Sequence, residues 1–210
     1  MNWHHKGSKV LIAGQSGSGK TTKFLDMFKT NGAKYKFAFD PDLEISRKIG
    51  IAPCKNVESM MRILTNCILG KTKTSVIVFD PADLFPADFG GGLSFFCRWT
   101  IDVSKTLHGK KLLAIDEIQK FTRTGNGGVP YALIEICDTG RREELDLLAV
   151  CNKGINELND DIRAQMTELF CFKTTTTNAQ KILSAEMNFS TEEIETVTKL
   201  PKGGFIHKKL

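Results

Sequence analysis

One short glycine-rich segment constrains the fold more than any other part of the sequence. It reads Gly14-Gln15-Ser16-Gly17-Ser18-Gly19-Lys20-Thr21. The segment has the spacing G-x-x-x-x-G-K-[ST], follows the apolar run Val10–Ala13 and precedes a helical pattern. Its glycines permit backbone angles and close approaches that a side chain would block, so backbone N–H groups and the helix N-terminus can face a polyphosphate. The segment therefore predicts a phosphate-binding loop between a strand and a helix.

We expect this loop to bind ATP through residues 14–21 and Thr22, with Mg²⁺ as the metal. The ammonium group of Lys20 supplies a cation to the β- and γ-phosphates, which makes it a catalytic residue as well as a ligand. The hydroxyl of Thr21 completes the coordination shell of the magnesium ion.

Two adjacent carboxylates, Asp116 and Glu117, follow another apolar run. A magnesium ion at the phosphates needs an acidic partner from a neighbouring strand, and Asp116 suits that role. Glu117 suits a general base that polarises an attacking water, so the pair of carboxylates favours hydrolysis. The alternative is that both are solvated surface carboxylates without a function. Asp40 and Asp80 also end strands but lack the adjacent glutamate. We assign both to strand termini, because a proline follows each of them.

Apolar runs alternate with helical patterns along most of the chain. We predict strands over Val10–Ala13, Phe37–Asp40, Ser75–Asp80, Leu112–Asp116, Leu147–Asn152 and Leu169–Lys173. We predict helices over Lys20–Lys29, Val57–Leu69, Leu93–His108, Pro130–Arg142 and Ile155–Gln165. This alternation is typical of an α/β fold, with a largely parallel central sheet and helices on both faces. In the third helix, Phe96, Trp99 and Leu107 share an apolar face, which we interpret as packing on the sheet.

The C-terminal part continues this pattern. Ser190 and Glu193 have the spacing of a capping box and predict a late helix. The segment Pro201–Ile206, which contains two glycines, is predicted to return as an edge strand. We therefore expect a single domain over residues 1–210, with a core of about 8–175 and with the late helix and edge strand in 176–210.

The composition excludes several classes of protein. Of the 210 residues, 41% are hydrophobic and 25% are charged, as in folded globular proteins. No apolar run approaches the roughly 18 residues that span a bilayer, and the first six residues lack the apolar core of a secretion signal. The six cysteines form no Cys-x-x-Cys pair, so we expect reduced core residues of a cytosolic protein, not a zinc site or a disulfide scaffold. The net charge of +5 permits a nucleic-acid partner without requiring one.

The run Leu147–Asn152 follows the acidic pair and ends in a polar residue. In P-loop enzymes with an added strand beside the phosphate loop, such a strand presents a polar side chain to the γ-phosphate from its carboxyl end. Asn152 suits that catalytic role, and capping of the next helix near Ile155 is the alternative.

These motifs occur together in one group of ATPases. Along the chain they are Gly14–Thr21, Asp116-Glu117, Gly140-Arg141-Arg142, the strand that ends at Asn152 and the segment Asn159–Gln165. In this combination the chain resembles the FtsK/HerA superfamily, and more narrowly the small genome-packaging ATPases of membrane-containing icosahedral viruses. The similarity extends from about residue 10 to residue 173.

The resemblance implies a P-loop NTPase fold of the additional-strand, catalytic-glutamate type. It implies an ATP-hydrolysing translocase that drives double-stranded DNA into a procapsid, with Mg²⁺-dependent and DNA-stimulated hydrolysis. The implied partners are further copies of the chain in a ring, such as a hexamer, and viral capsid or vertex proteins. The implied location is the host cytoplasm or the virion, at the packaging vertex.

The resemblance also assigns a role to two arginines. Arg141 is the arginine finger that reaches the γ-phosphate of the neighbouring subunit, with Arg142 as the close alternative. A pair of surface arginines balanced by Glu143 and Glu144 is the other interpretation. This chain departs from the family at Asn152, where the strand usually ends in glutamine, a longer amide.

Two segments are candidates for contacts with DNA. The segment Thr122–Gly128 follows the acidic pair, and its Arg123 suits a contact with the DNA backbone; a plain flexible connection is the alternative. The basic C-terminal end suits DNA or a capsid protein, whereas solvated terminal lysines need no function. Its lysines are Lys199, Lys202, Lys208 and Lys209.

We weigh three functions. The first is the packaging ATPase described above. The second is a small-molecule or nucleotide kinase, which shares the fold and the loop but needs an arginine-rich lid, and no arginine-rich segment lies between the later strands. The third is a nucleotide-dependent adaptor that does not hydrolyse ATP.

Overall fold

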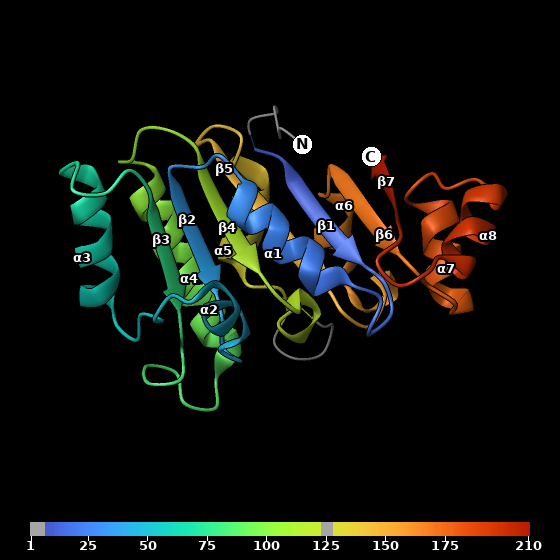
Figure 1. The fold of residues 1–210 in the computed structure, drawn as a ribbon, viewed down its shortest axis with the longest axis horizontal. Coiled ribbons are helices and arrows are strands. Elements are labelled where there is room, and N and C mark those ends of the chain that lie inside the picture. Colours follow the sequence, from blue (N-terminus) through green and yellow to red (C-terminus); the bar gives the residue numbers. More distant parts are fainter. Residues whose placement is uncertain (1–6, 123–127) are drawn as a thin grey trace.

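The computed structural model describes residues 7–122 and 128–210, which form a central sheet flanked by helices (Figure 1). In this part of the chain the sheet has seven strands, in the order β3-β2-β4-β5-β1-β6-β7. The strands are β1 Lys9–Ala13, β2 Tyr35–Phe39, β3 Ser75–Phe79, β4 Lys111–Ile115, β5 Leu145–Cys151, β6 Glu168–Phe172 and β7 Phe205–Lys209. β7 pairs with β6 in the antiparallel direction, and the other neighbouring pairs are parallel. The predicted α/β class is confirmed.

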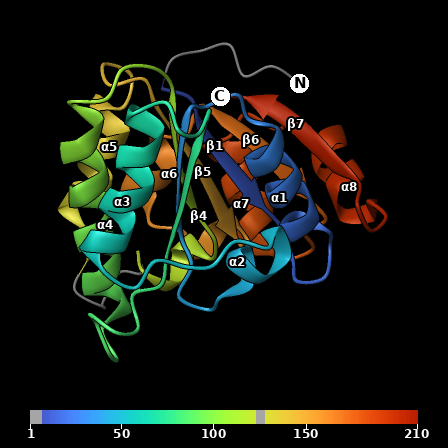
Figure 2. The same ribbon diagram turned by 60° about the vertical axis from the view of Figure 1, so that its left-hand side comes forward.

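Helices cover both faces of the sheet. They are α1 Lys20–Thr30, α2 Glu44–Ile49, α3 Val57–Ile68, α4 Phe89–Ser104, α5 Tyr131–Thr139, α6 Asp160–Ala164, α7 Thr177–Ala185 and α8 Thr191–Lys199. On one face, Phe24 of α1 and Ile45 of α2 share a core with Ile12 of β1. On the other face, a larger core contains Leu11 of β1 and side chains of α3, α4 and α5, which Figure 2 shows grouped on one side of the strands. Strands buried on both faces explain the apolar runs without alternation.

The position of β5 decides where the functional residues meet. β5 lies between β1 and β4, although it follows both in the sequence. Ala13 of β1 pairs with Cys151 of β5, and Ile115 of β4 pairs with Ala149. The carboxyl ends of three neighbouring strands therefore meet at one edge of the sheet. The predicted added strand beside the phosphate loop is confirmed.

The predicted helix Ile155–Gln165 is wrong as a continuous element. The structure has a short 3₁₀ helix, η2 (Ile155–Glu157), followed by α6. Leu158 is extended between them, with a ψ of 136°. The side chain of Asn159 then accepts a hydrogen bond of 2.9 Å from the N–H of Asp161. Asn159 starts a new helix because its side chain satisfies a free N–H group of the first turn.

Two helices, α2 and α7, are missing from the sequence-based prediction. α2 is short, and its start depends on the distant end of β2. The Asp40 carboxylate accepts hydrogen bonds from the N–H groups of Ile45 and Ser46, at 3.0 and 2.7 Å. α7 begins at the last residue of a run of threonines, Thr174–Thr177, and threonine has low helix propensity. Tertiary contacts stabilise both helices where local periodicity is weak.

α4 begins at Phe89, earlier than the predicted Leu93, and so includes three consecutive glycines. The Asp88 side chain accepts a hydrogen bond of 2.9 Å from the N–H of Gly91. A Cβ atom at Gly92 would lie 2.8 Å from the Cβ atom of Pro81. The glycines therefore form a capped, closely packed first turn.

The predicted apolar face of α4 is confirmed. Phe96 is fully buried, and the ring of Trp99 meets Phe37 of β2 edge-on, with 5.6 Å between centroids. Leu107 lies beyond the end of α4 and is also buried in this core. The six cysteines are all buried free thiols, as predicted for core residues.

The C-terminal expectations are also borne out. Ser190 Oγ accepts a 3.2 Å hydrogen bond from Glu193 N–H, and the Glu193 carboxylate accepts one of 2.8 Å from Ser190 N–H. The edge strand begins at Phe205 and not at Pro201, because Gly204 N–H donates to the Pro201 carbonyl and closes a turn. Among the described residues, no helix combines the length and apolarity needed to cross a bilayer.

We predict that Ser190→Ala lowers the free energy of unfolding by about 1 kcal/mol, because the substitution removes the side-chain acceptor of the capping box. Urea unfolding followed by circular dichroism measures this change. Ser184→Ala, at an exposed position of α7, is the matched control and should change stability by less than about 0.5 kcal/mol. Equal losses in both variants would contradict a specific role of the cap.

Candidate nucleotide-binding site

The glycine-rich loop joins the carboxyl end of β1 to the N-terminus of α1. Gly14 has a φ of 151° and Gly19 a φ of 106°, both in the region that favours glycine. A Cβ atom at Gly14 would lie 2.7 Å from the Cβ atom of Phe172, so a side chain does not fit there. Within the loop, Ser16 and Gly17 are exposed, and Thr22 is exposed in the first turn of α1. The loop has the strand–loop–helix setting that the motif requires.

Lys20 points into the loop. It is 3% exposed, and its Nζ donates a 2.7 Å hydrogen bond to the carbonyl oxygen of Gln15. Burial lowers the pKa of Lys20, whereas Cys151, Asp116 and Glu117 lie near enough to raise it in part. The ammonium group is thus held at the centre of the loop, close to the carboxyl ends of β4 and β5. Thr21 is half-buried beside it.

The turn at Gly203, near the C-terminus, supports the phosphate-binding loop. The sequence reasoning missed this contact. Gly203 N–H donates a 2.8 Å hydrogen bond to the Ser18 carbonyl. A Cβ atom at Gly19 would lie 3.1 Å from the Cα atom of Gly203. On the other side, Gln15 N–H donates to the Lys173 carbonyl at 2.9 Å. The glycines at 203 and 204 are the only sequence signal of this close approach that we find.

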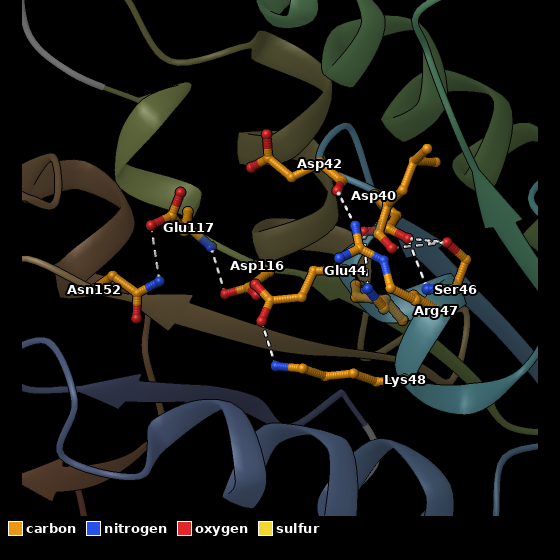
Figure 3. Close-up of polar contacts among 11 residues, drawn as sticks. Asp40, Asp42, Glu44, Ser46, Arg47, Lys48, Asp116, Glu117 and Asn152 are labelled. Atoms are coloured by element: carbon orange, nitrogen blue, oxygen red, sulfur yellow. Dashed lines mark hydrogen bonds and ion pairs between the residues drawn. The ribbon is translucent and has the colours of Figure 1, made fainter.

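Asp116 and Glu117 directly follow β4, and their side chains point away from each other. Glu117 has a φ of 50°, and its N–H donates a 2.8 Å hydrogen bond to Asp116 Oδ1 (Figure 3). Burial raises the pKa of Asp116 to about 6 against the opposing effect of this hydrogen bond, and the carboxylates of Glu44 and Glu117 raise it further. Asp116 is therefore a half-buried carboxylate that a nearby cation would stabilise.

The Glu117 carboxylate is held at both oxygens. Asn152 Nδ2 donates a 2.9 Å hydrogen bond to Oε1, as Figure 3 shows. Oε2 forms an ion pair with Lys120, whose Nζ also bonds Asp42 at 2.8 Å. The alternative role of Asn152 as a helix cap is wrong, because η2 is preceded by Gly154 and has no side-chain cap.

Gln119 is a further residue of this site that the sequence reasoning missed. It is 1% exposed, and its side-chain oxygen accepts a 3.2 Å hydrogen bond from the N–H of Asn152. This contact ties the turn after β4 to the end of β5. Lys120 and Asp42 were missed as well, because nothing local distinguishes them from solvated surface charges.

The residues present fit a magnesium ion between Thr21 and Asp116. Asp116 is half-buried and has a raised pKa, which a cation at the carboxylate would reverse. Among residues 7–122 and 128–210, no group of three or more His, Cys, Asp or Glu side chains forms a metal site. Mg²⁺ at this place would take its other ligands from phosphate and water, as it commonly does.

Asp40 and Asp80 are structural, as assigned from the sequence. The Asp40 carboxylate is occupied by the start of α2, where it also accepts a 2.8 Å hydrogen bond from Ser46 Oγ. Asp80 Oδ1 accepts a 2.9 Å hydrogen bond from Ala82 N–H in the turn after β3. Their carboxylates thus satisfy backbone N–H groups at strand ends.

The structure does not bring Arg141 and Arg142 to the loop of the same chain. Both are exposed between α5 and β5, at the amino end of the strand whose carboxyl end carries Asn152. They therefore lie across the length of the sheet from Lys20. Arg123 lies outside the described residues.

The basic C-terminal end contains lysines with structural contacts. Lys208 Nζ pairs with Glu193 at 2.5 Å and lies 4.7 Å from the centre of the Phe189 ring, which ties β7 to α8. Lys199 lies 4.0 Å from Glu195 on α8, and Lys202 and Lys209 are exposed.

Comparison with known proteins identifies the fold. No protein-family model matches the chain, and no curated protein matches it. A structure of the genome packaging NTPase B204 from Sulfolobus turreted icosahedral virus 2, in complex with AMPPCP, is similar over 97% of this chain and 92% of that chain, with a TM-score of 0.66 and 22% identity. The fold is that of B204. VirB4 of Thermoanaerobacter pseudethanolicus is similar over 97% of this chain and 89% of that chain, with a TM-score of 0.62 and 13% identity. The resemblance predicted from the motifs is thereby confirmed for the fold.

We predict that Asp116→Asn stabilises the nucleotide-free protein near neutral pH. The pKa of this carboxyl rises from 3.8 to about 6 on folding, so the folded state keeps a proton that the unfolded state has lost. The wild type therefore loses stability as pH rises through this interval, and the amide does not. We expect a gain of up to about 3 kcal/mol near pH 7 and almost none near pH 4.

Urea unfolding at the two pH values measures this difference. Asp83→Asn, at an exposed position after β3, is the matched control and should show no such pH dependence. An Asp116→Asn variant less stable than the wild type near neutral pH would contradict the raised pKa.

Proposed function

We propose that the protein is a Mg²⁺-dependent ATPase that moves double-stranded DNA into a viral procapsid. The observation that carries the proposal is the Glu117 carboxylate, held by Asn152 and Lys120 next to the loop that contains Lys20. The fold likeness to B204, which is described as a genome packaging NTPase and a DNA-packaging ATPase, supports the biological setting. The proposed location is the host cytoplasm and the packaging vertex of the virion.

Each residue has a role that its position supports. The loop N–H groups and Lys20 bind the triphosphate, and Thr21 and Asp116 would hold Mg²⁺, which offsets negative charge on the phosphates. Glu117 accepts a proton from the water that attacks the γ-phosphate, and the leaving group is ADP. Asn152 orients the Glu117 carboxylate for this task, so the shorter amide suffices where the related family has glutamine.

The proposed assembly is a ring in which each site is completed by the next subunit. Arg141 and Arg142 are exposed and lie at the opposite edge of the sheet from their own loop, so they suit a phosphate in another copy of the chain. A guanidinium at the γ-phosphate stabilises charge in the transition state. Capsid or vertex proteins are the proposed anchors of the ring.

We predict that Glu117→Gln lowers ATP turnover by about 10²- to 10⁴-fold while nucleotide binding is retained, because the amide cannot accept the proton of water. Turnover is measured by phosphate release, and binding by a fluorescent ATP analogue, with and without double-stranded DNA. Asp83→Asn is the matched control and should hydrolyse ATP like the wild type. Hydrolysis at the wild-type rate in Glu117→Gln would remove Glu117 from the mechanism. Turnover that requires a small phosphoryl acceptor and ignores DNA would favour a kinase instead.

We predict that inactive Arg141→Ala and inactive Glu117→Gln restore activity when mixed. Subunits with Arg141→Ala keep an intact loop and acidic pair, and a Glu117→Gln neighbour supplies the missing guanidinium. Phosphate release is measured across mixing ratios and protein concentrations, with Arg142→Ala tested in parallel to separate the two arginines. The absence of recovery at every ratio for both arginine variants would contradict an arginine supplied in trans.

A further inference from the structure

A buried glutamine lies next to the acidic pair. Gln119 belongs to η1 (Ile118–Lys120), the short 3₁₀ helix that follows Glu117, and it is 1% exposed. Glutamine is mostly exposed in proteins, because the burial of an amide is unfavourable unless hydrogen bonds replace those to water. The burial of Gln119 therefore needs an explanation in its contacts.

The amide of Gln119 reaches across to the end of β5. Its oxygen accepts a 3.2 Å hydrogen bond from the N–H of Asn152. Since a backbone N–H can only donate, its partner is the amide oxygen and not the nitrogen, which fixes the orientation of the amide. The nitrogen, Nε2, is buried without a hydrogen-bond partner in the described parts of the chain. The contact that accounts for this side chain is thus the one with Asn152.

The N–H of Asn152 needs an acceptor because β5 runs further than β4 at this edge of the sheet. Leu147 N–H donates to the Ser8 carbonyl on the β1 side, so alternation along the strand places the N–H of Asn152 on the β4 side. The pairing of β5 with β4 ends at Ala149, three residues before Asn152. Gln119 thus supplies an acceptor beyond the point where β4 has ended.

The turn after β4 forms without this side chain. Lys120 N–H donates to the Glu117 carbonyl at 2.8 Å, which closes η1 through the backbone. The bond between Gln119 and Asn152 is therefore not needed to form the turn. It fixes instead the position of the end of β5 relative to the turn, and these two segments carry Asn152 and Glu117.

We propose that Gln119 is a positioning residue, which holds the end of β5 so that the Asn152 amide stays on the Glu117 carboxylate. The inference rests on the proposed function, because it assigns a task in the hydrolysis step. Asn152 Nδ2 donates to Glu117 at 2.9 Å (Figure 3), and Gln119 holds the backbone of the same asparagine at 3.2 Å. Gln119 thus acts on Glu117 through Asn152.

The direct restraint on Glu117 is weaker than this indirect one. Lys120 also pairs with the carboxylate, but the lysine side chain is 46% exposed, and exposed ion pairs contribute little. Asn152 is half-buried and Gln119 is buried, so water competes less for their hydrogen bonds. The orientation of the general base therefore depends mainly on the route through Gln119.

Stability does not account for a glutamine at this position. A buried donor without a partner destabilises the folded state, and an apolar side chain of similar volume avoids that loss. Gln119→Met is such a replacement. A residue that only packed the turn would lose stability and activity together when replaced, whereas a positioning residue loses activity alone.

The test compares Gln119→Met, Asn152→Ala and the double variant. Turnover is measured by phosphate release across ATP concentrations, and stability by urea unfolding. We expect Gln119→Met to lower kcat by about 10- to 100-fold with KM within about twofold, because the base is misplaced while the loop still binds ATP. The urea midpoint should equal or exceed that of the wild type. The double variant should be no slower than Asn152→Ala, because both changes interrupt the same route.

The matched control is Thr100→Val in α4. Thr100 is fully buried, and its hydroxyl oxygen has no hydrogen-bond partner among residues 7–122 and 128–210. The substitution therefore also removes an unpaired buried polar atom but leaves the site intact. Thr100→Val should hydrolyse ATP like the wild type.

Each other outcome overturns the inference in a recognisable way. If Gln119→Met hydrolyses ATP at the wild-type rate while Glu117→Gln is inactive, the inference fails and the proposed function stands. If Gln119→Met lowers the urea midpoint together with turnover, the residue is structural. If Gln119→Met slows the Asn152→Ala variant by the same factor as the wild type, it acts independently of Asn152. If the wild type hydrolyses no ATP, the proposed function fails together with the inference.

Discussion

The insertion of β5 between β1 and β4 is the constraint on which the site depends. It separates the phosphate loop from the acidic pair by one strand, and two strand spacings of about 4.8 Å leave about 10 Å between them. That width accommodates a terminal phosphate, its metal ion and a water. Asn152 directly follows the intervening strand, and its amide thereby lies 2.9 Å from the Glu117 carboxylate. Without β5 between β1 and β4, this amide would not lie beside the Glu117 carboxylate.

Burial acts on the charges of the site in a way that favours a charged ligand. It lowers the pKa of Lys20 and raises that of Asp116, so the fold opposes the ionised form of each group. A triphosphate beside the ammonium and a divalent cation beside the carboxylate offset both penalties.

Several residues of the site could not be found from the sequence. Lys120 meets Asp42 across 78 positions of the chain, and Gln119 meets Asn152 across 33. Such pairs leave no periodic pattern, since either partner alone looks like an ordinary polar residue near a strand end. The support of Ser18 by Gly203 is of the same kind, because only the return of β7 beside β6 brings the C-terminal turn to the loop.

The sequence by itself determined the features that depend on neighbouring residues. These are the loop with its glycines, the apolar runs, most helices and the capping box at Ser190, all written in local spacing and backbone chemistry. Only the tertiary structure decided the strand order, the break at Leu158 and the start of α2 on Asp40. Such features arise when distant segments satisfy one another's hydrogen bonds and bury one another's apolar faces. That choice depends on the packing of the whole chain, which no local pattern records.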